Sequence, residues 1–311
     1  MHERLAAIAA SQSGVFSMSD ALRVGVSTNE LTRMVRRKEV IRVRRGAYVV
    51  AATYWGTPSF DRYRLRVRAV LRSRRPGERA SHQSALALHK VGTFGAREDV
   101  VVLESRDVSR TRTNSGLVTV PWSGGATWEF GAFHCVSATA ACVQVSVASG
   151  FIAGVSAMDS AIVQERCTHE DLAGVIATLP ARPRAAAQRA LDAVDPRAES
   201  VGETRTRIIL IDAGFSLRSQ VRIKDARTLI GRVDFLVDDC VVVEFDGLLK
   251  YGGDRGQAAL VAEKAREERL TRLGYEVVRV VWAELDDPAD IVRRVRRARA
   301  VARERRAALT R

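Results

Sequence analysis

Three carboxylates interrupt two apolar segments in the last third of the sequence, where buried strands normally carry hydrophobic residues. Asp234 lies within Val233–Val237, and Glu244 and Asp246 follow Val241–Val243. Residues two apart on a strand share a face, so Glu244 and Asp246 should point the same way. Asp234 joins them if the neighbouring strand pairs in register. Three converging, partly buried carboxylates repel one another and need a compensating cation.

A hard divalent ion is the natural compensation, because Mg²⁺ and Mn²⁺ take oxygen ligands and keep bound waters. Such an ion activates water and stabilises charge on a phosphoryl oxygen. The pattern therefore predicts Mg²⁺ or Mn²⁺ held by Asp234, Glu244 and Asp246, and hydrolysis of phosphodiester bonds. The alternative is a set of strand-end acids that are solvated or paired in salt bridges.

The segments around these acids alternate between helical and extended patterns from Asp195 to the end of the chain. The expected elements are helix Glu199–Ile211, strands Ser219–Ile223, Arg232–Val237 and Cys240–Asp246, helix Gln257–Leu273, strand Tyr275–Trp282 and helix Pro288–Ala308. Gly274 is placed to end the helix expected over Gln257–Leu273 as a C′ residue. A strand as apolar as Cys-Val-Val-Val indicates a central sheet that is covered on both faces.

Four motifs in this region occur in a recognisable order: Glu199–Arg207, Gly231–Phe235, Val243–Tyr251 and Glu263–Val280. Together they resemble the PD-(D/E)XK superfamily, and specifically the domain similar to the very-short-patch-repair mismatch endonuclease. The resemblance implies a restriction-endonuclease-like α/β/α domain with a mixed sheet over residues 195–311. It also implies an endodeoxyribonuclease that depends on a metal ion.

The resemblance assigns roles to the acidic residues. Glu203 matches a first-helix glutamate that helps to hold the metal ion or its water. Asp234 matches the central metal ligand, and Glu244 matches the second acid. Asp246 departs from the pattern, because it stands where the simple pattern has a lysine. This departure puts activity, though not the fold, in question.

A positive group is still needed near the attacking water or the developing charge. Lys250 is the first candidate and Lys264, from the following helix, is the second. Arg266 and Arg279 either contact phosphate or pair with local acids, and the sequence leaves both readings open.

The charge of the whole chain favours a polyanionic partner. The formal net charge is +14 and the pI is about 10.5. Three basic clusters stand out: Arg33–Arg45 with seven basic residues, Arg62–Arg79 with eight, and Val292–Arg311 with nine, each with one acid. Each phosphate that a basic residue neutralises releases counterions, so nucleic-acid contact explains the clusters. Solvated helix faces are the alternative for any single cluster.

The first 56 residues have the order of a winged helix-turn-helix. A short helix over His2–Ser11 is followed by a helix that ends at Arg23, with Ser19 as its expected N-cap. Ser27 or Thr28 should cap the next helix. Alternating residues over 40–50, turning near Arg45–Gly46, predict a pair of strands.

In such a unit the second helix of the motif enters the major groove, and the wing lies along the phosphates. Arginine and asparagine can make bidentate contacts with base edges. The expected DNA-binding residues are Asn29, Thr32, Arg33, Arg36 and Arg37 on the helix and Arg42, Arg44 and Arg45 on the wing. A winged helix that makes only protein contacts is the alternative.

The stretch from Val15-Phe16-Ser17 to Arg44-Arg45-Gly46-Ala47-Tyr48 resembles the N-terminal winged-helix domain of AbiEi-type antitoxins and transcriptional regulators. The resemblance covers about a sixth of the chain. It implies DNA binding and leaves open a cognate toxin partner in a type IV toxin–antitoxin system.

Residues 57–194 predict an α/β connecting domain of unknown role. Helices are expected over Phe60–Leu71 and Ser81–His89, and a later helix over Met158–Glu165. His82 and His89 are seven residues apart and could share a helix face. Histidines that serve the structure are the default for both.

The leading hypothesis is a DNA-directed nuclease, in which the winged helix positions the C-terminal domain. The alternative is a DNA-binding regulator or antitoxin whose nuclease-like domain is inactive or structural. RNA binding is a weaker hypothesis, because aromatic residues make up only 6% of the chain and no stacking motif occurs.

Composition also suggests a compartment. No apolar run approaches the roughly 18 residues of a membrane span, and the N-terminus lacks a signal-peptide core. Cys135, Cys142, Cys167 and Cys240 form no metal-binding pair. The expectation is a cytoplasmic protein with buried free thiols. The sequence leaves the target site and the oligomeric state open.

Overall fold

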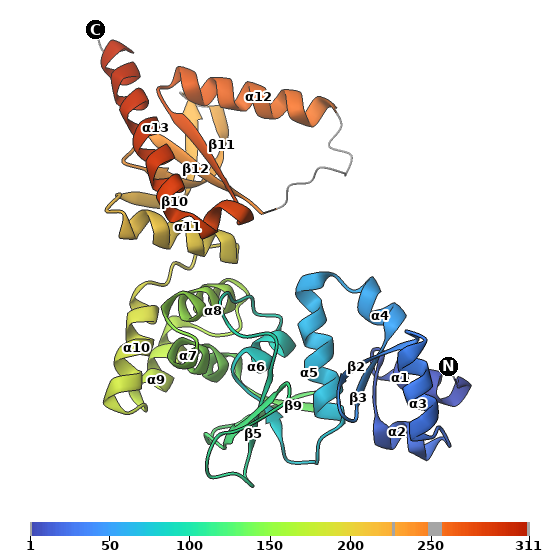
Figure 1. Cartoon of the computed structure of the whole chain (residues 1–311). Coiled ribbons are helices and arrows are strands. Elements are labelled where there is room, and N and C mark those ends of the chain that lie inside the picture. The colour runs from blue at the N-terminus through green and yellow to red at the C-terminus, as the bar shows by residue number, and fades with distance from the viewer. Residues whose placement is uncertain (1, 226–227, 248–256, 310–311) are drawn as a thin grey trace. The chain divides into compact units, whose positions relative to one another are not determined.

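The computed structural model describes residues 2–225, 228–247 and 257–309 (Figure 1). The chain separates into two compact units, Met1–Ala193 and Val194–Arg311, each with its own core. Both units combine helices with mixed or antiparallel sheets, so the expected α/β class is confirmed.

The N-terminal part of the first unit folds as a winged helix-turn-helix. It contains α1 (Glu3–Ser11), β1 (Val15–Ser17), α2 (Met18–Arg23), α3 (Thr28–Arg36), β2 (Val40–Arg44) and β3 (Ala47–Val50). The three strands pair antiparallel in the order β1-β3-β2. Leu5, Phe16, Leu31 and Tyr48 are almost completely buried in one core, which fixes α3 against the sheet.

Both helices of the helix-turn-helix begin at a capping box. Ser17, not the expected Ser19, caps α2: its hydroxyl accepts from the Asp20 N–H at 3.1 Å, and the Asp20 carboxylate accepts from the Ser17 N–H at 2.9 Å. Ser19 is wrong as the cap because it already lies inside the helix, whereas Ser17 has an acid three residues on. At α3 the cap is Ser27, which pairs in the same way with Glu30.

The rest of the first unit has a mixed sheet of six strands in the order β6-β7-β5-β4-β9-β8. Its strands are β4 (Arg79–Ala80), β5 (Val101–Ser105), β6 (Arg112–Asn114), β7 (Leu117–Pro121), β8 (Thr127–Phe130) and β9 (Phe133–Val136). Its helices are α4 (Ala51–Gly56), the 3-10 turn η1 (Ser59–Asp61), α5 (Arg62–Arg72), α6 (His82–His89), α7 (Ala138–Ala148), α8 (Phe151–Val163), α9 (His169–Ala177) and α10 (Ala181–Asp192).

Helix α8 starts seven residues before the expected Met158. Gly150, with φ of 92°, separates α7 from α8. Helix α8 begins at Phe151, and most of its residues are buried. A helix that is apolar on all sides lacks the periodic pattern that marks its start.

One ion-pair cluster joins the winged helix to α5. Asp20 on α2 is 2% exposed, and Arg72 on α5 donates to it with two bonds of 2.9 and 2.7 Å. Arg23 adds a third donor at 2.7 Å. This network lowers the pKa of Asp20 to about 2, against the effect of burial.

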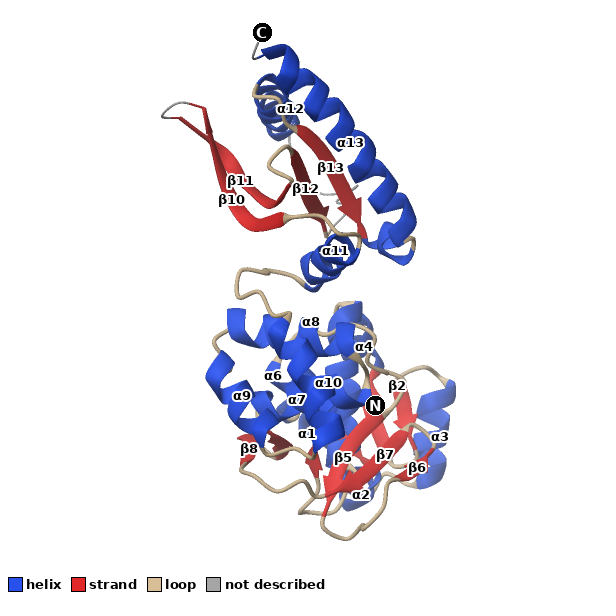
Figure 2. Cartoon of the chain, turned by 90° about the vertical axis from the view of Figure 1, so that its left-hand side faces the viewer, coloured by secondary structure: helices blue, strands red, loops and turns tan. Residues whose placement is uncertain are grey.

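The second unit is a four-stranded sheet with helices on both faces (Figure 2). Its elements are α11 (Val201–Asp212), β10 (Leu217–Asp225), β11 (Thr228–Val237), β12 (Val241–Asp246), α12 (Gln257–Arg272), β13 (Glu276–Val281), the 3-10 turn η2 (Trp282–Asp286) and α13 (Pro288–Leu309). The order is β10-β11-β12-β13, antiparallel except for the parallel pair β12–β13.

The two faces of this sheet have separate cores. Leu210 of α11 and Val295 of α13 pack with Phe235 and Val243 on one face. Leu270 of α12 packs with Leu236 and Val242 on the other. The predicted cover on both faces is confirmed. Gly274 follows α12 with φ of 81°, as expected of a C′ glycine.

Candidate functional site

Helix α3 presents a polar, basic side to solvent. Leu31 and Met34 are buried, whereas Asn29, Arg33 and Arg36 are exposed. Among the described residues, no ion pair or side-chain hydrogen bond engages these three side chains. Such uncommitted donors on the second helix of the motif suit contacts with base edges and phosphates.

Two further predicted residues, Arg37 and Thr32, are also exposed on this part of the chain. Arg37 is exposed and directly follows α3 as its C-cap. The hydroxyl of Thr32 is also exposed, but it donates to the backbone oxygen of Thr28 at 2.9 Å. Thr32 therefore offers DNA its methyl group and an acceptor oxygen more readily than a donor.

The three wing arginines differ in their surroundings. Arg42 and Arg45 are exposed. Arg44 is half-buried, and burial together with the neighbouring charge of Arg74 lowers its pKa. Within the described part of the chain, the Nε atom of Arg44 has no hydrogen-bond partner. Arg42 and Arg45 are thus better placed than Arg44 for contact with phosphates.

In the second unit, strand pairing brings two of the predicted acids together. Phe235 lies opposite Val243 in the antiparallel pair β11–β12, so Asp234 and Glu244 are the next facing positions. The Phe245 N–H donates to Asp234 Oδ2 at 2.8 Å. Even so, burial and the charges of nearby glutamates raise the pKa of Asp234 to about 6. Asp234 is the electrostatically strained member of the group.

Glu203 approaches this pair from the N-terminal turn of α11. Its carboxylate accepts from Ser200 Oγ at 2.8 Å and from Gln220 Nε2 on β10 at 2.9 Å. Burial raises its pKa, and its charge is one of those that raise the pKa of Asp234. Gly202 allows the approach, because a Cβ atom there would overlap the ring of Phe245.

The guanidinium group of Arg266 lies beside Glu244. Arg266 of α12 donates to Glu244 Oε1 at 2.6 Å and to the backbone oxygen of Arg232 at 3.1 Å. Of the two readings that the sequence left open for Arg266, pairing with an acid is the one the structure shows. Glu244 could not be predicted as the partner, because the contact depends on how α12 is rotated over the sheet.

Asp246 lies apart from the pairing of Asp234 with Glu244, on the side of β12 that adjoins β13 in the register. It is half-buried at the end of β12, opposite Val281 of β13. No three His, Cys, Asp or Glu side chains in residues 2–225, 228–247 and 257–309 are arranged to hold a metal ion. The structure thus brings Glu203, Asp234 and Glu244 near one another, whereas three-carboxylate metal binding stays a prediction.

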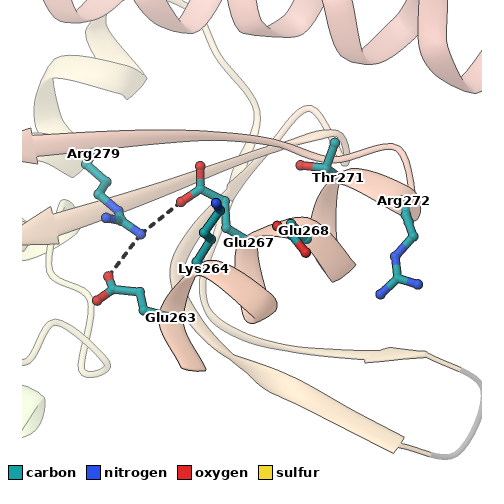
Figure 3. A pocket seen from close by; sticks show the side chains of 7 residues that line it. All are labelled: Glu263, Lys264, Glu267, Glu268, Thr271, Arg272 and Arg279. Atoms are coloured by element: carbon teal, nitrogen blue, oxygen red, sulfur yellow. Dashed lines mark hydrogen bonds and ion pairs between the residues drawn. The ribbon is translucent and has the colours of Figure 1, made fainter. Parts of the chain in front are cut away.

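The two candidate lysines have different outcomes. Lys250 lies outside the described residues. Lys264 is exposed on α12 and lines an open groove of about 760 Å³, together with Glu263, Glu267, Glu268, Thr271, Arg272 and Arg279 (Figure 3). In that groove Arg279 pairs with Glu263 at 2.9 Å and with Glu267 at 3.1 Å. Arg279, like Arg266, therefore pairs with local acids.

The N-terminal fold is a winged helix-turn-helix whose second motif helix exposes basic side chains. Residues 3–51 match the family model described as "Transcriptional regulator, AbiEi antitoxin". The chain thus carries an AbiEi-type domain at its N-terminus. This match covers residues 3–51 and does not extend to residues 195–311.

Two proteins of Mycobacterium tuberculosis are similar to part of the chain. They are "Uncharacterized protein MT2308" of strain CDC 1551 / Oshkosh and "Uncharacterized protein Rv2248" of strain ATCC 25618 / H37Rv. Each is 28% identical over 147 residues, which cover 46% of this chain and 53% of the relative. The chain therefore spans about half the length of these curated relatives, and their names assign no activity.

Two general expectations can be compared with the structure. All four cysteines are free and buried, as predicted. Among the helices that the structure describes, none combines the length and the hydropathy required to cross a membrane.

Proposed function

We propose that this chain is a DNA-binding transcriptional regulator that reads its site through α3 and holds the adjacent backbone through the wing. The observation that carries the proposal is the match of residues 3–51 to a regulator family, on a fold whose second motif helix exposes Asn29, Arg33 and Arg36. A net charge of +14 supports the same partner through attraction to phosphates.

The proposal is tested by gel-shift titration with the promoter DNA of the protein's own gene at physiological salt. Each bidentate arginine contact is worth about 1–3 kcal/mol, so Arg33→Ala with Arg36→Ala should weaken binding by about 30-fold or more. Arg110→Ala with Arg182→Ala removes the same charge from two exposed positions of the first unit and is the matched control. Equal losses in both double variants would show that only bulk charge matters, and a wild type that ignores the promoter would refute the proposal.

The family description also names an antitoxin, so a cognate toxin is the protein partner we propose. The supporting observation is the same match over residues 3–51. The measurement is growth of cells that express the product of the adjacent gene, with and without this chain. Growth arrest that this chain does not relieve would argue against the partner.

A second candidate function is metal-dependent hydrolysis of DNA by the second unit. One observation favours it: Asp234 is held in a partly buried place next to Glu203 and Glu244, although burial and then the charges of these acids raise its pKa to about 6. An arrangement of acids that costs stability is typical of sites kept for function. Asp234 and Glu244 could hold a divalent ion through one or two carboxylates, with water and a substrate phosphate completing its shell.

This second function is tested with supercoiled plasmid, single-stranded and mismatched DNA in the presence of Mg²⁺ or Mn²⁺. Asp234→Asn should abolish cleavage, because the ligand charge is lost while the shape is kept. Asp239→Asn is the matched control, since Asp239 is an exposed acid in the turn before β12. Cleavage that survives Asp234→Asn, or a wild type that is inert with both ions, would reject the nuclease and leave the regulator untouched.

A further inference from the structure

A groove of about 640 Å³ opens in the first unit, between α7, α9 and the segment that joins β7 to β8. One wall is apolar and includes Val143, Val147, Val175 and Leu179. The volume lies within the range of small-molecule sites, about 300–1,000 Å³, which are mostly apolar with a few placed polar groups. The polar end of the groove therefore decides what it could bind.

A buried ion pair fixes the polar end. Arg79 and Glu104 are 1% and 0% exposed and lie 2.7 Å apart. Arg79 also donates to three successive backbone oxygens of the β7–β8 segment: Gly124, Gly125 at 3.2 Å and Ala126 at 3.0 Å. The guanidinium face stacks on the Trp122 ring at 3.7 Å. The segment is held from within by one arginine.

The hydrogen bonds that Arg79 donates to this segment orient the backbone N–H groups of the segment away from the ion pair. The C=O and N–H of one peptide plane point in opposite directions, so an oxygen aimed at Arg79 sends the following N–H the other way. The N–H groups concerned belong to Gly125 and Ala126, which line the groove. Over the described ranges, neither N–H has a hydrogen-bond partner. Successive outward N–H groups of this kind form a cradle for an acceptor atom.

The groove carries no net charge at this end. The charges of Arg79 and Glu104 cancel, and Gln144 donates to Glu104 Oε1 at 2.7 Å. Gln144 in turn accepts from the His82 N–H at 2.9 Å, which anchors the start of α6. Burial lowers the pKa of the His82 imidazole, so this ring is neutral at physiological pH. Among the described residues that line the groove there is no Asp, Glu, Lys or Arg to pair with a charged ligand.

We propose that this groove binds a small, uncharged molecule with an apolar body and a carbonyl oxygen, which accepts hydrogen bonds from the Gly125 and Ala126 N–H groups. The apolar wall takes the body of the ligand, and the cradle orients its oxygen. The proposal is independent of the DNA-binding and nuclease functions, because it rests on residues of neither surface.

The probe for the experiment is Prodan, an uncharged naphthalene ketone whose emission shifts to the blue in an apolar site. The full-length protein is titrated by fluorescence, and we expect saturable binding of one Prodan per chain. Gly174 lines the groove on α9, and a Cβ atom there meets nothing within 4 Å. Gly174→Trp should therefore place a large side chain at the groove and weaken binding by about tenfold or more.

Ala177→Trp is the matched control, because Ala177 is exposed on the same helix and does not line the groove. It should leave the affinity for Prodan within about twofold of wild type. A second pair uses charge: Val147→Asp, on the apolar wall, should weaken binding, whereas Val163→Asp on α8 should not. Val147 and Val163 are 42% and 37% exposed, so either change is tolerated by the fold.

Each outcome decides the proposal. Loss of binding in Gly174→Trp and Val147→Asp, with both controls unchanged, supports it. Wild-type affinity in Gly174→Trp would place the dye elsewhere and overturn it. Absence of saturable binding up to about 100 µM Prodan would overturn it as well.

Discussion

Replacing Asp234 by asparagine should make the second unit more stable at neutral pH. The folded chain raises the pKa of Asp234 from 3.8 to about 6. One pKa unit corresponds to about 1.4 kcal/mol, so the ionised carboxylate costs about 3 kcal/mol above pH 6. Asparagine removes that charge and can still accept the hydrogen bond from the Phe245 N–H.

The sign of the pH dependence follows from the raised pKa. The folded state holds the Asp234 proton more tightly than the unfolded state, so the cost is full above pH 6 and vanishes as the pH falls toward 4. Asp234→Asn should exceed wild type by up to about 3 kcal/mol at pH 7.5 and match it at pH 4.

The assay is urea unfolding followed by hydrogen exchange of peptides from residues 194–311, without divalent ions. Peptide resolution separates this unit from residues 1–193, since a chain with two units need not unfold in one step. Asp239→Asn is the control and should change stability by less than about 0.5 kcal/mol, because its ion pair with Arg218 is exposed. A gain at pH 4 that equals the gain at pH 7.5 would refute the electrostatic reasoning.

The same variant separates a metal site from a merely strained acid. If Asp234 binds Mg²⁺, millimolar Mg²⁺ should stabilise wild type by mass action and leave Asp234→Asn unchanged. Equal responses of both proteins to Mg²⁺ would speak against metal binding at Asp234, whatever the stability result.

Three further changes test other parts of the fold. Asp20→Asn should cost about 2 kcal/mol at pH 7, because Arg72 lowers the pKa of this carboxyl from 3.8 to about 2; in urea unfolding the cost should disappear between pH 4 and pH 2. Gly202→Ala should destabilise the second unit by about 1–3 kcal/mol in the same assay, since its methyl group would overlap the ring of Phe245. Gly174→Ala should stabilise α9 by about 0.5–1 kcal/mol, seen as slower hydrogen exchange in that helix, because the new methyl group meets no neighbour.

Local pattern was enough to predict most elements of the second unit. A run of valines before Glu244 predicted a buried strand, and β12 spans Val241–Asp246. Because carboxylates are rare in such strands, the sequence predicts that Glu244 and Asp246 share a face and that Asp234 joins them if the neighbouring strand pairs in register. The register of β11 and β12 pairs Phe235 with Val243, so that Asp234 and Glu244 are the next positions along the two strands. Short-range spacing and hydrophobicity are thus enough to predict where strands lie and which of their residues share a face.

The contacts that the sequence could not predict are those set by long-range packing. Strand β4 contains only Arg79 and Ala80, which is too short to show a period of two. The capture of the β7–β8 segment by Arg79 joins residues about 45 positions apart, and nothing in the local sequence indicates it. The groove beside that segment therefore could not be predicted from the sequence of residues 57–194.

The pairing of Arg266 with Glu244 bears directly on whether the second unit is an enzyme. The expected pattern has a lysine at the position of Asp246, and a lysine can both stabilise charge and exchange a proton. Arg266 supplies a cation from a different element, and a guanidinium stays protonated in proteins, so it can neutralise charge but cannot transfer a proton. While Arg266 holds Glu244 at 2.6 Å, Asp234 is the carboxylate left to bear the repulsion of its neighbours. A divalent ion would have to compete with Arg266 for Glu244. Arg266→Ala therefore tests the metal site separately from the first unit: it should raise Mg²⁺ affinity if the acids bind a divalent ion, and it should leave promoter binding by α3 unchanged.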